Sequence, residues 1–188
     1  MSVHTGRLVL TEQDPFRLPD AAALVAALGA GGLIGGPLPG RPAAYVTGPR
    51  FLGLVTFAGC AVQLELSPRG DGGPFCHIRL AGPYPEPRFL HGRNTRPPRC
   101  PSCRAPLKGW AEAGLGWDGS AMQPLACPAC AASAPAFRWD WKEGAGFGRL
   151  LVAIEEVFPG EAVPSPALLD LLARASGQPW RHFYVQDA

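Results

Sequence analysis

Residues 100–130 read CPSCRAPLKGWAEAGLGWDGSAMQPLACPAC, with a cysteine pair at each end and 23 residues between the two pairs. A gap of two residues lets both thiolates of a pair reach the same metal ion from one tight turn, and two such turns complete a tetrahedral site. The sequence therefore predicts one metal centre, and its expected ligands are Cys100, Cys103, Cys127 and Cys130.

Four cysteine ligands leave no coordination position for water or substrate, so we expect a structural ion that takes no part in catalysis. Zinc is the expected ion. Each C-x-x-C could instead be a redox pair or form a disulfide. A redox pair usually stands at the start of a helix in a βαβ unit, which this loop-rich segment lacks, and disulfides are typical of exported proteins. Zinc binding is therefore favoured over both.

Residues 99–131 resemble the zinc ribbon family, in which two cysteine knuckles on facing hairpins share one zinc ion. Knuckles of that family often read C-P-x-C-G. This chain keeps Pro101 and Pro128, but Arg104 and Ala131 stand where glycine is common. The resemblance implies a zinc ribbon that is irregular, with a distorted second turn. Rubredoxins share the knuckle and bind iron, which leaves iron as the alternative to zinc. The rest of the chain resembles no characterised family.

The segment around the cysteines has no sustained hydrophobic periodicity. We therefore expect an insert of residues 97–135 within a core domain formed by residues 1–96 and 136–188. The insert is too poor in apolar residues to fold by itself. Bound zinc would supply on the order of 10 kcal/mol of folding free energy to it.

Short elements are expected in the core domain, because Gly and Pro account for 24 and 22 of the 188 residues. Branched and aromatic runs predict strands, and apolar residues at helical spacing predict helices. Early strands followed by helices and a last strand are typical of an α+β fold with a mainly antiparallel sheet. The expected strands are 51–57, 61–66, 75–80, 137–141 and 180–185, and the expected helices begin near residues 20, 146 and 166, the second running to residue 158.

Capping residues mark two of these helices. Asp20 can cap a helix that Gly29 ends, and Ser165 can cap one that starts at Pro166 and stops at Gly177. The apolar stripes that should face the core are Leu24, Val25 and Leu28 in the first helix, and Leu168, Leu169, Leu171 and Leu172 in the last.

Positive charge is concentrated between residues 88 and 108, where six cationic residues stand without any acidic one. The rest of the chain holds the other 11 of 17 basic residues and all 15 acidic residues. Such a stripe can bind nucleic acid phosphates or an acidic protein surface, with His91, Asn94 and Thr95 as further donors. The alternative is that these are solvated loop residues, some of them paired with carboxylates. The six are Arg88, Arg93, Arg96, Arg99, Arg104 and Lys108.

Two further features could serve a nucleic acid or phosphate ligand. A base could stack on Trp110 or Trp117, although tryptophans in a small insert more often form its core or its contact with the main domain. Residues 144–148, GAGFG, could cradle phosphate between a strand and a helix. They lack the spacing of a dinucleotide site and the lysine of a P-loop, and so are more typical of a tight turn.

No catalytic motif such as G-x-S-x-G or H-E-x-x-H is present. Cys60 and Cys76 are expected to be small buried hydrophobic residues. The sequence therefore favours a non-catalytic binding or adaptor protein. The alternative is an enzyme of unrecognised type that uses residues such as Glu65, His77 or Asp140 on the main sheet, with the ribbon as scaffolding.

The N-terminus lacks the charged start and apolar run of a secretory signal. The uncharged stretch 21–40 has the length of a membrane span, but its glycines interrupt any long helix. We expect a cytoplasmic protein without a membrane span. The preference for arginine over lysine, together with many Ala, Gly and Pro residues, suggests a bacterial source.

Overall fold

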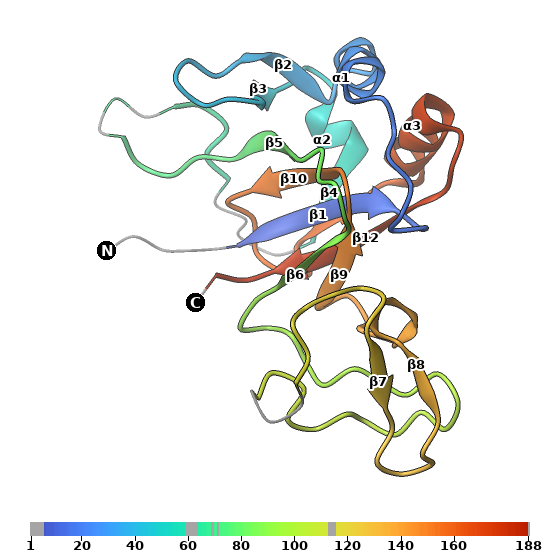
Figure 1. Cartoon of the computed structure of the whole chain (residues 1–188). Coiled ribbons are helices and arrows are strands. Elements are labelled where there is room, and N and C mark those ends of the chain that lie inside the picture. Colours follow the sequence, from blue (N-terminus) through green and yellow to red (C-terminus); the bar gives the residue numbers. More distant parts are fainter. Residues whose placement is uncertain (1–5, 59–63, 69, 71, 113–115, 188) are drawn as a thin grey trace.

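The structure, a computed structural model, describes residues 6–58, 64–68, 70, 72–112 and 116–187. Within them, six strands form one sheet in the order β12-β1-β10-β5-β3-β2, and every neighbouring pair is antiparallel (Figure 1). This confirms the predicted α+β class with a mainly antiparallel sheet. The strands are β1 (Arg7–Glu12), β2 (Ile34–Pro37), β3 (Ala44–Thr47), β5 (His77–Ala81), β10 (Leu151–Glu155) and β12 (Trp180–Val185).

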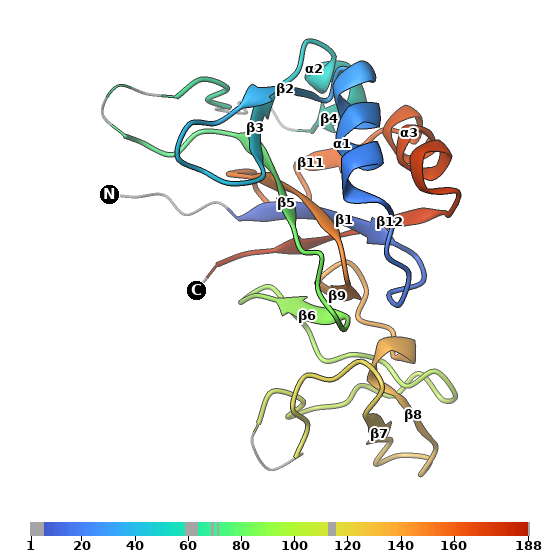
Figure 2. The same cartoon turned by 45° about the horizontal axis from the view of Figure 1, so that its top comes forward.

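Helices pack on one face of this sheet (Figure 2). In the described part of the chain they are α1 (Ala21–Ala30), α2 (Phe51–Leu54) and α3 (Pro166–Ser176). The main hydrophobic core lies between these helices and the sheet, where Leu28 and Leu168 meet strand residues such as Leu10, Ile78 and Val152.

Both helices with capping signals form. The side chains of Asp20 and Ser165 each accept a hydrogen bond from a backbone N–H of the first turn, at 2.8 and 3.3 Å. Gly177 ends α3 in the left-handed conformation, at φ 72°. Helix α1 runs past Gly29 and takes Gly31 as its C-cap. The capping predictions are thus confirmed, apart from the end of α1.

The opposite face of the sheet is covered over part of its area. Strands β6 (Arg88–His91) and β9 (Ala145–Gly148) form a separate antiparallel pair below it (Figure 2). Tyr84 and Leu90 pack there against a small apolar cluster of Val9, Ala81, Leu151, Phe183 and Val185. The remainder of this face carries charged side chains.

The helix predicted at 146–158 is wrong, because these residues form β9 and β10. Strand β10 lies inside the sheet with apolar neighbours on both faces, so its sequence lacks the alternation of a half-exposed strand. Close packing accounts for the glycines of β9. A Cβ at Gly146 would lie 2.5 Å from the Phe183 ring, and one at Gly148 would collide with Thr11.

The strand predicted at 51–57 is half wrong, because α2 precedes β4 (Val55–Phe57). Phe51 and Leu54 face the core while Leu52 is 60% exposed, which is the spacing of a helical turn. Strand β4 pairs with β11 (Ala162–Pro164). Of the predicted strand 61–66, residues 61–63 lie outside the described residues and residues 64–66 form no strand.

Of the remaining predicted strands, 180–185 is confirmed as β12, and 75–80 corresponds to β5 with a start two residues later. The strand predicted at 137–141 is wrong. That segment begins with the 3-10 turn η2 (Ala136–Arg138) and then makes a single bridge from Asp140 to Arg99. Short aromatic runs are ambiguous between strand and helix, and tertiary contacts decide between them.

No helix in the described part of the chain is both long and apolar enough to cross a membrane. In the stretch 21–40, α1 ends after ten residues and the chain continues into β2.

Candidate metal centre

The four predicted cysteines lie together, with all sulfur atoms within 4.8 Å of one another. Cys100 and Cys130 have their Sγ atoms 3.8 Å apart, and those of Cys103 and Cys127 are 3.6 Å apart. A tetrahedron with metal–sulfur bonds of about 2.3 Å has edges of about 3.8 Å. The sulfur positions therefore fit one four-coordinate metal ion.

The two cysteine knuckles share one backbone pattern. The N–H of Arg104 donates to the Cys100 carbonyl at 3.0 Å, and the N–H of Ala131 donates to the Cys127 carbonyl at 2.9 Å. Arg104 and Ala131 both have left-handed backbones, with φ of 66° and 58°. The expected distortion of the second turn is therefore absent. Both residues adopt the conformation that glycine prefers, at a cost of roughly 1–2 kcal/mol each.

The hairpins that carry the knuckles differ in length. Strands β7 (Pro124–Ala126) and β8 (Ser133–Pro135) flank the second knuckle with three paired residues. The first knuckle has one bridge, between Arg99 and Pro106. The hairpin around the first knuckle is therefore less regular than the one around the second.

Backbone N–H groups around Cys100 prepare its sulfur for a cation. Hydrogen bonds from the N–H groups of Cys103 and Ser102, together with the neighbouring thiols, lower the pKa of Cys100 to about 6, while thiol contacts and burial raise the pKa of Cys130 to about 12. The Ser102 nitrogen lies 3.4 Å from the Cys100 sulfur. A thiolate is the form that binds a metal, and four thiolates suit a soft ion such as zinc or iron. The residues present fit such an ion.

Aromatic rings connect the cysteine segment to the strands beside it. Trp117 lies 4.9 Å from Phe89 of β6 and stacks on Trp141 at 5.4 Å, while Trp110 meets Phe89 edge-on at 5.9 Å. These tryptophans therefore pack against Phe89 of β6 and against Trp141, which fits the expectation that they form a small core or a packing contact. The same apolar cluster contains Cys100, Leu107, Leu125, Cys127, Trp139, Ala145 and Phe147. The division into an insert of 97–135 and a core domain stays a prediction.

All six predicted cations, Arg88, Arg93, Arg96, Arg99, Arg104 and Lys108, are exposed. They do not form one uniform stripe. Arg104 pairs with Asp140 at 2.6 Å, and Arg88 lies over the Tyr84 ring at 5.4 Å. Within the described residues, the side chains of Arg93, Arg96 and Lys108 have no such partner.

Asp140 is the carboxylate around which the first knuckle and the following segment meet. Besides Arg104, it pairs with Lys142 at 2.8 Å, and its backbone exchanges two hydrogen bonds with Arg99. Partial burial alone would raise the pKa of Asp140, but hydrogen bonds from Lys142 and Arg104 outweigh it and hold that pKa at about 2. Sequence reasoning did not place Lys142 in this cluster, because its contact with Asp140 depends on the turn between them.

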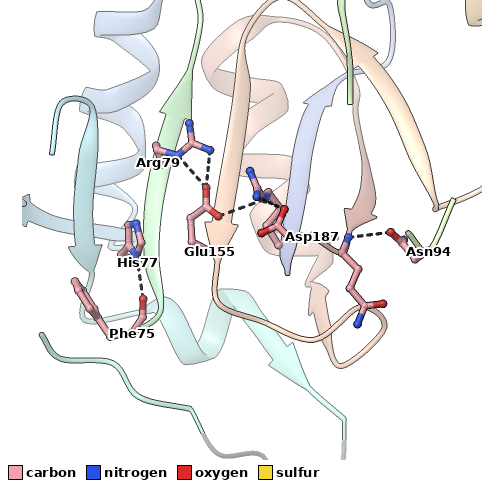
Figure 3. Close-up of polar contacts among 8 residues, drawn as sticks. Phe75, His77, Arg79, Asn94, Glu155 and Asp187 are labelled. Carbon is pink, nitrogen blue, oxygen red and sulfur yellow. Dashed lines mark hydrogen bonds and ion pairs between the residues drawn. The ribbon is translucent and has the colours of Figure 1, made fainter. Parts of the chain in front are cut away.

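Two of the three further donors predicted beside the arginines, Asn94 and Thr95, are used inside the protein, whereas His91 is exposed and stacks against the Phe89 ring at 5.1 Å. The Asn94 side chain donates to the Tyr184 carbonyl at 2.9 Å and accepts from the Gln186 N–H at 2.8 Å, the second contact being drawn in Figure 3. The Thr95 hydroxyl donates to the Gly144 carbonyl and accepts from a backbone N–H. These bonds fix the turn from which Arg93 and Arg96 project.

The residues considered for catalysis come from three segments of the chain, and the Glu65 carbonyl accepts a hydrogen bond from the Cys76 N–H at 2.7 Å, next to His77. Asp140 is engaged beside the first knuckle, Glu65 accepts a hydrogen bond from the Ser67 N–H in a loop, and His77 lies on the main sheet. Burial raises the pKa of the Cys76 thiol to about 12, which makes it inert.

Two other predictions concern Cys60 and the glycine-rich segment. Cys60 lies outside the described residues. Residues 145–148 of the GAGFG segment form the buried strand β9. The segment is therefore neither a phosphate loop nor a tight turn.

Comparison of the chain with protein-family models, with curated proteins and with solved structures finds no match.

Proposed function

We propose that the four thiolates hold one structural Zn²⁺ and that the ribbon so formed serves a non-catalytic binding protein, which contacts nucleic acid through its basic flank. The observation that carries the metal assignment is the sulfur geometry, with separations of 3.6 and 3.8 Å in an all-cysteine set. Reduced thiolates suit a cytoplasmic protein.

Three exposed cations support the binding role. Arg93, Arg96 and Lys108 have no carboxylate partner in the described part of the chain, and Asn94 and Thr95 hold the backbone between the two arginines. Guanidinium groups presented by a fixed turn lose little conformational freedom when they meet phosphate oxygens. The zinc ion contributes by holding the neighbouring knuckle in place.

Elemental analysis of the purified protein tests the metal assignment. We expect one zinc ion per chain. When a chelator removes the zinc, the four cysteine thiols should become reactive towards a thiol reagent. Iron in place of zinc would support the rubredoxin-like alternative. A metal-free protein with four intact thiols would overturn the site.

Binding of labelled single-stranded RNA and duplex DNA, measured at about 50 and about 200 mM salt, tests the partner. The double variant R93A/R96A should weaken binding and reduce the slope of log K against log salt by about 1.4 for single strands. The control R17A/R174A removes two exposed arginines elsewhere and has the same net charge. We expect it to bind like the wild type. Absence of binding at low salt would contradict the nucleic acid role and leave an acidic protein as the partner to test.

A further inference from the structure

A cavity of about 520 Å³ lies on the sheet face opposite the helices. Its floor is a row of side chains from adjacent strands, because the register places Arg7 beside Glu155 and Glu155 beside His77, with Arg79 next to them (Figure 3). The loop Gly40–Pro42, between β2 and β3, forms one wall. This volume lies within the usual range for small-molecule sites, roughly 300 to 1,000 Å³.

Carboxylates hold two arginines in fixed positions in this floor. One oxygen of Glu155 accepts from Arg79 Nε at 2.9 Å and lies 2.7 Å from Arg79 Nη2, and its other oxygen lies 3.4 Å from Arg7 Nε. Arg7 also pairs with Asp187. The positions of these guanidinium groups are thus set before any ligand arrives.

Donor capacity remains after these pairs have formed. In the described residues, Arg79 Nη1 has no partner and Arg41 has no carboxylate partner. Arg41 is held over the Phe75 ring at 5.4 Å. Its loop is fixed by a hydrogen bond from the Leu80 N–H to the Ala43 carbonyl at 2.9 Å, and Ala43 has a strained φ of 53°. Strain of this kind often accompanies binding sites.

His77 adds an acceptor to the cavity. It is 8% exposed, and its Nδ1 lies 2.9 Å from the Phe75 carbonyl oxygen. A carbonyl can only accept, so Nδ1 carries a proton, and the tautomer with that single proton has a lone pair on Nε2. Figure 3 shows the other ring nitrogen turned away from Phe75. A ligand with a hydroxyl or N–H group could donate to it.

We infer that this cavity binds a small organic molecule that carries a carboxylate or phosphate group with a hydrogen-bond donor beside it. Arg41 and Arg79 bind the oxyanion, since guanidinium groups match carboxylate and phosphate geometry. His77 accepts from the neighbouring donor. Three arginines and three carboxylates line the cavity, so recognition depends on directed hydrogen bonds and not on a net positive field.

A purely structural role for the charged residues explains only part of the cavity. It explains why Glu155 and Asp187 hold Arg7 and Arg79. It leaves out Arg41, which lies over the Phe75 ring and pairs with no carboxylate among the described residues, and it leaves out His77. The site uses none of the six ribbon cations and is therefore independent of the proposed nucleic acid binding.

NMR titration of the full chain with four probes tests the inference. Glycerate offers a carboxylate with a hydroxyl, glycerol phosphate offers a phosphate with hydroxyls, acetate lacks the hydroxyl, and sodium chloride at matched ionic strength is the blank. We expect saturable shifts at Arg41, His77 and Arg79 with glycerate or glycerol phosphate. The tighter of the two identifies the oxyanion, and acetate should bind more weakly.

The variant Arg41→Ala should weaken binding about tenfold, because one charge-assisted contact is lost. It leaves the Glu155 network intact, and the unchanged spectrum of the sheet would show that it folds. The control Arg174→Ala removes an exposed arginine on α3 and should bind like the wild type. Equal shifts with chloride, or equal affinity in Arg41→Ala, would overturn the inference.

Discussion

The cysteine ribbon and the cavity on the sheet are built in opposite ways. The four sulfur atoms come from 31 consecutive residues, and each pair sits in one turn closed by its own backbone hydrogen bonds. The cavity draws Arg7, Arg41, His77, Glu155 and Asp187 from distant parts of the chain. The spacing of the cysteines along the chain therefore sets the proposed metal site, whereas the pairing register of the strands sets the cavity. The two regions should respond separately to substitution.

The largest expected effect comes from Cys127→Ser, which changes a buried cysteine of the proposed metal site. Loss of the metal would remove on the order of 10 kcal/mol of folding free energy from the ribbon. We expect zinc content near zero and loss of chemical-shift dispersion for the Trp110 and Trp117 indole NMR signals. The backbone signals of β1 and β10 should stay unchanged. The control Cys76→Ala should keep its zinc. Full zinc content in Cys127→Ser would contradict the ligand assignment.

The reverse experiment is Gly146→Ala in β9, which crowds Phe183 of β12 and changes none of the four cysteines. The added methyl group would meet the buried Phe183 ring at 2.5 Å, and overpacking of this kind costs roughly 1–3 kcal/mol. Urea denaturation should show that loss with zinc still bound. The matched control is Gly29→Ala in α1, where nothing lies within 4 Å, and it should stabilise by about 0.5–1 kcal/mol. Equal stability of the two variants would contradict the packing.

Ala131→Gly tests whether the left-handed backbone of the second knuckle is strained. Ala131 has φ 58°, and glycine relieves the left-handed strain, which should stabilise the zinc-bound ribbon by about 1 kcal/mol. Competition with a zinc chelator measures this as tighter metal retention. Ala129→Gly, at an exposed position in the same knuckle, is the control and should not strengthen retention. Weaker retention in Ala131→Gly would show that the knuckle is not strained there.

The smallest effect is expected from Asp140→Asn. The pKa of Asp140 is lowered to about 2, so its ion pairs stabilise fully above the unfolded pKa and lose that effect as pH falls towards 2. The variant should lose about 0.2–1 kcal/mol in urea denaturation, constant from about pH 5 to 7, as for a partly exposed pair. Asp170→Asn, on the surface of α3, should change nothing. A pH-dependent difference within that range would contradict the low pKa.

Sequence reasoning succeeded where the deciding contacts are local. The helix caps Asp20 and Ser165 bond to groups within three residues, and the cysteine pairs need only their own turns. It failed at 146–158, where an apolar run has the same composition whether it forms a buried strand or a helix. It also expected a distorted turn at Ala131, although alanine there takes the left-handed backbone.

The sequence by itself determined the α+β class, the set of four cysteines and the ends of α3, because short-range bonds and spacing specify them. Only the tertiary structure decided which arginines form ion pairs and which charged residues line the cavity. It also decided that the Asn94 side chain donates a hydrogen bond to the Tyr184 carbonyl of β12. Those contacts join residues up to 180 positions apart, and they exist only once antiparallel register has aligned the strands.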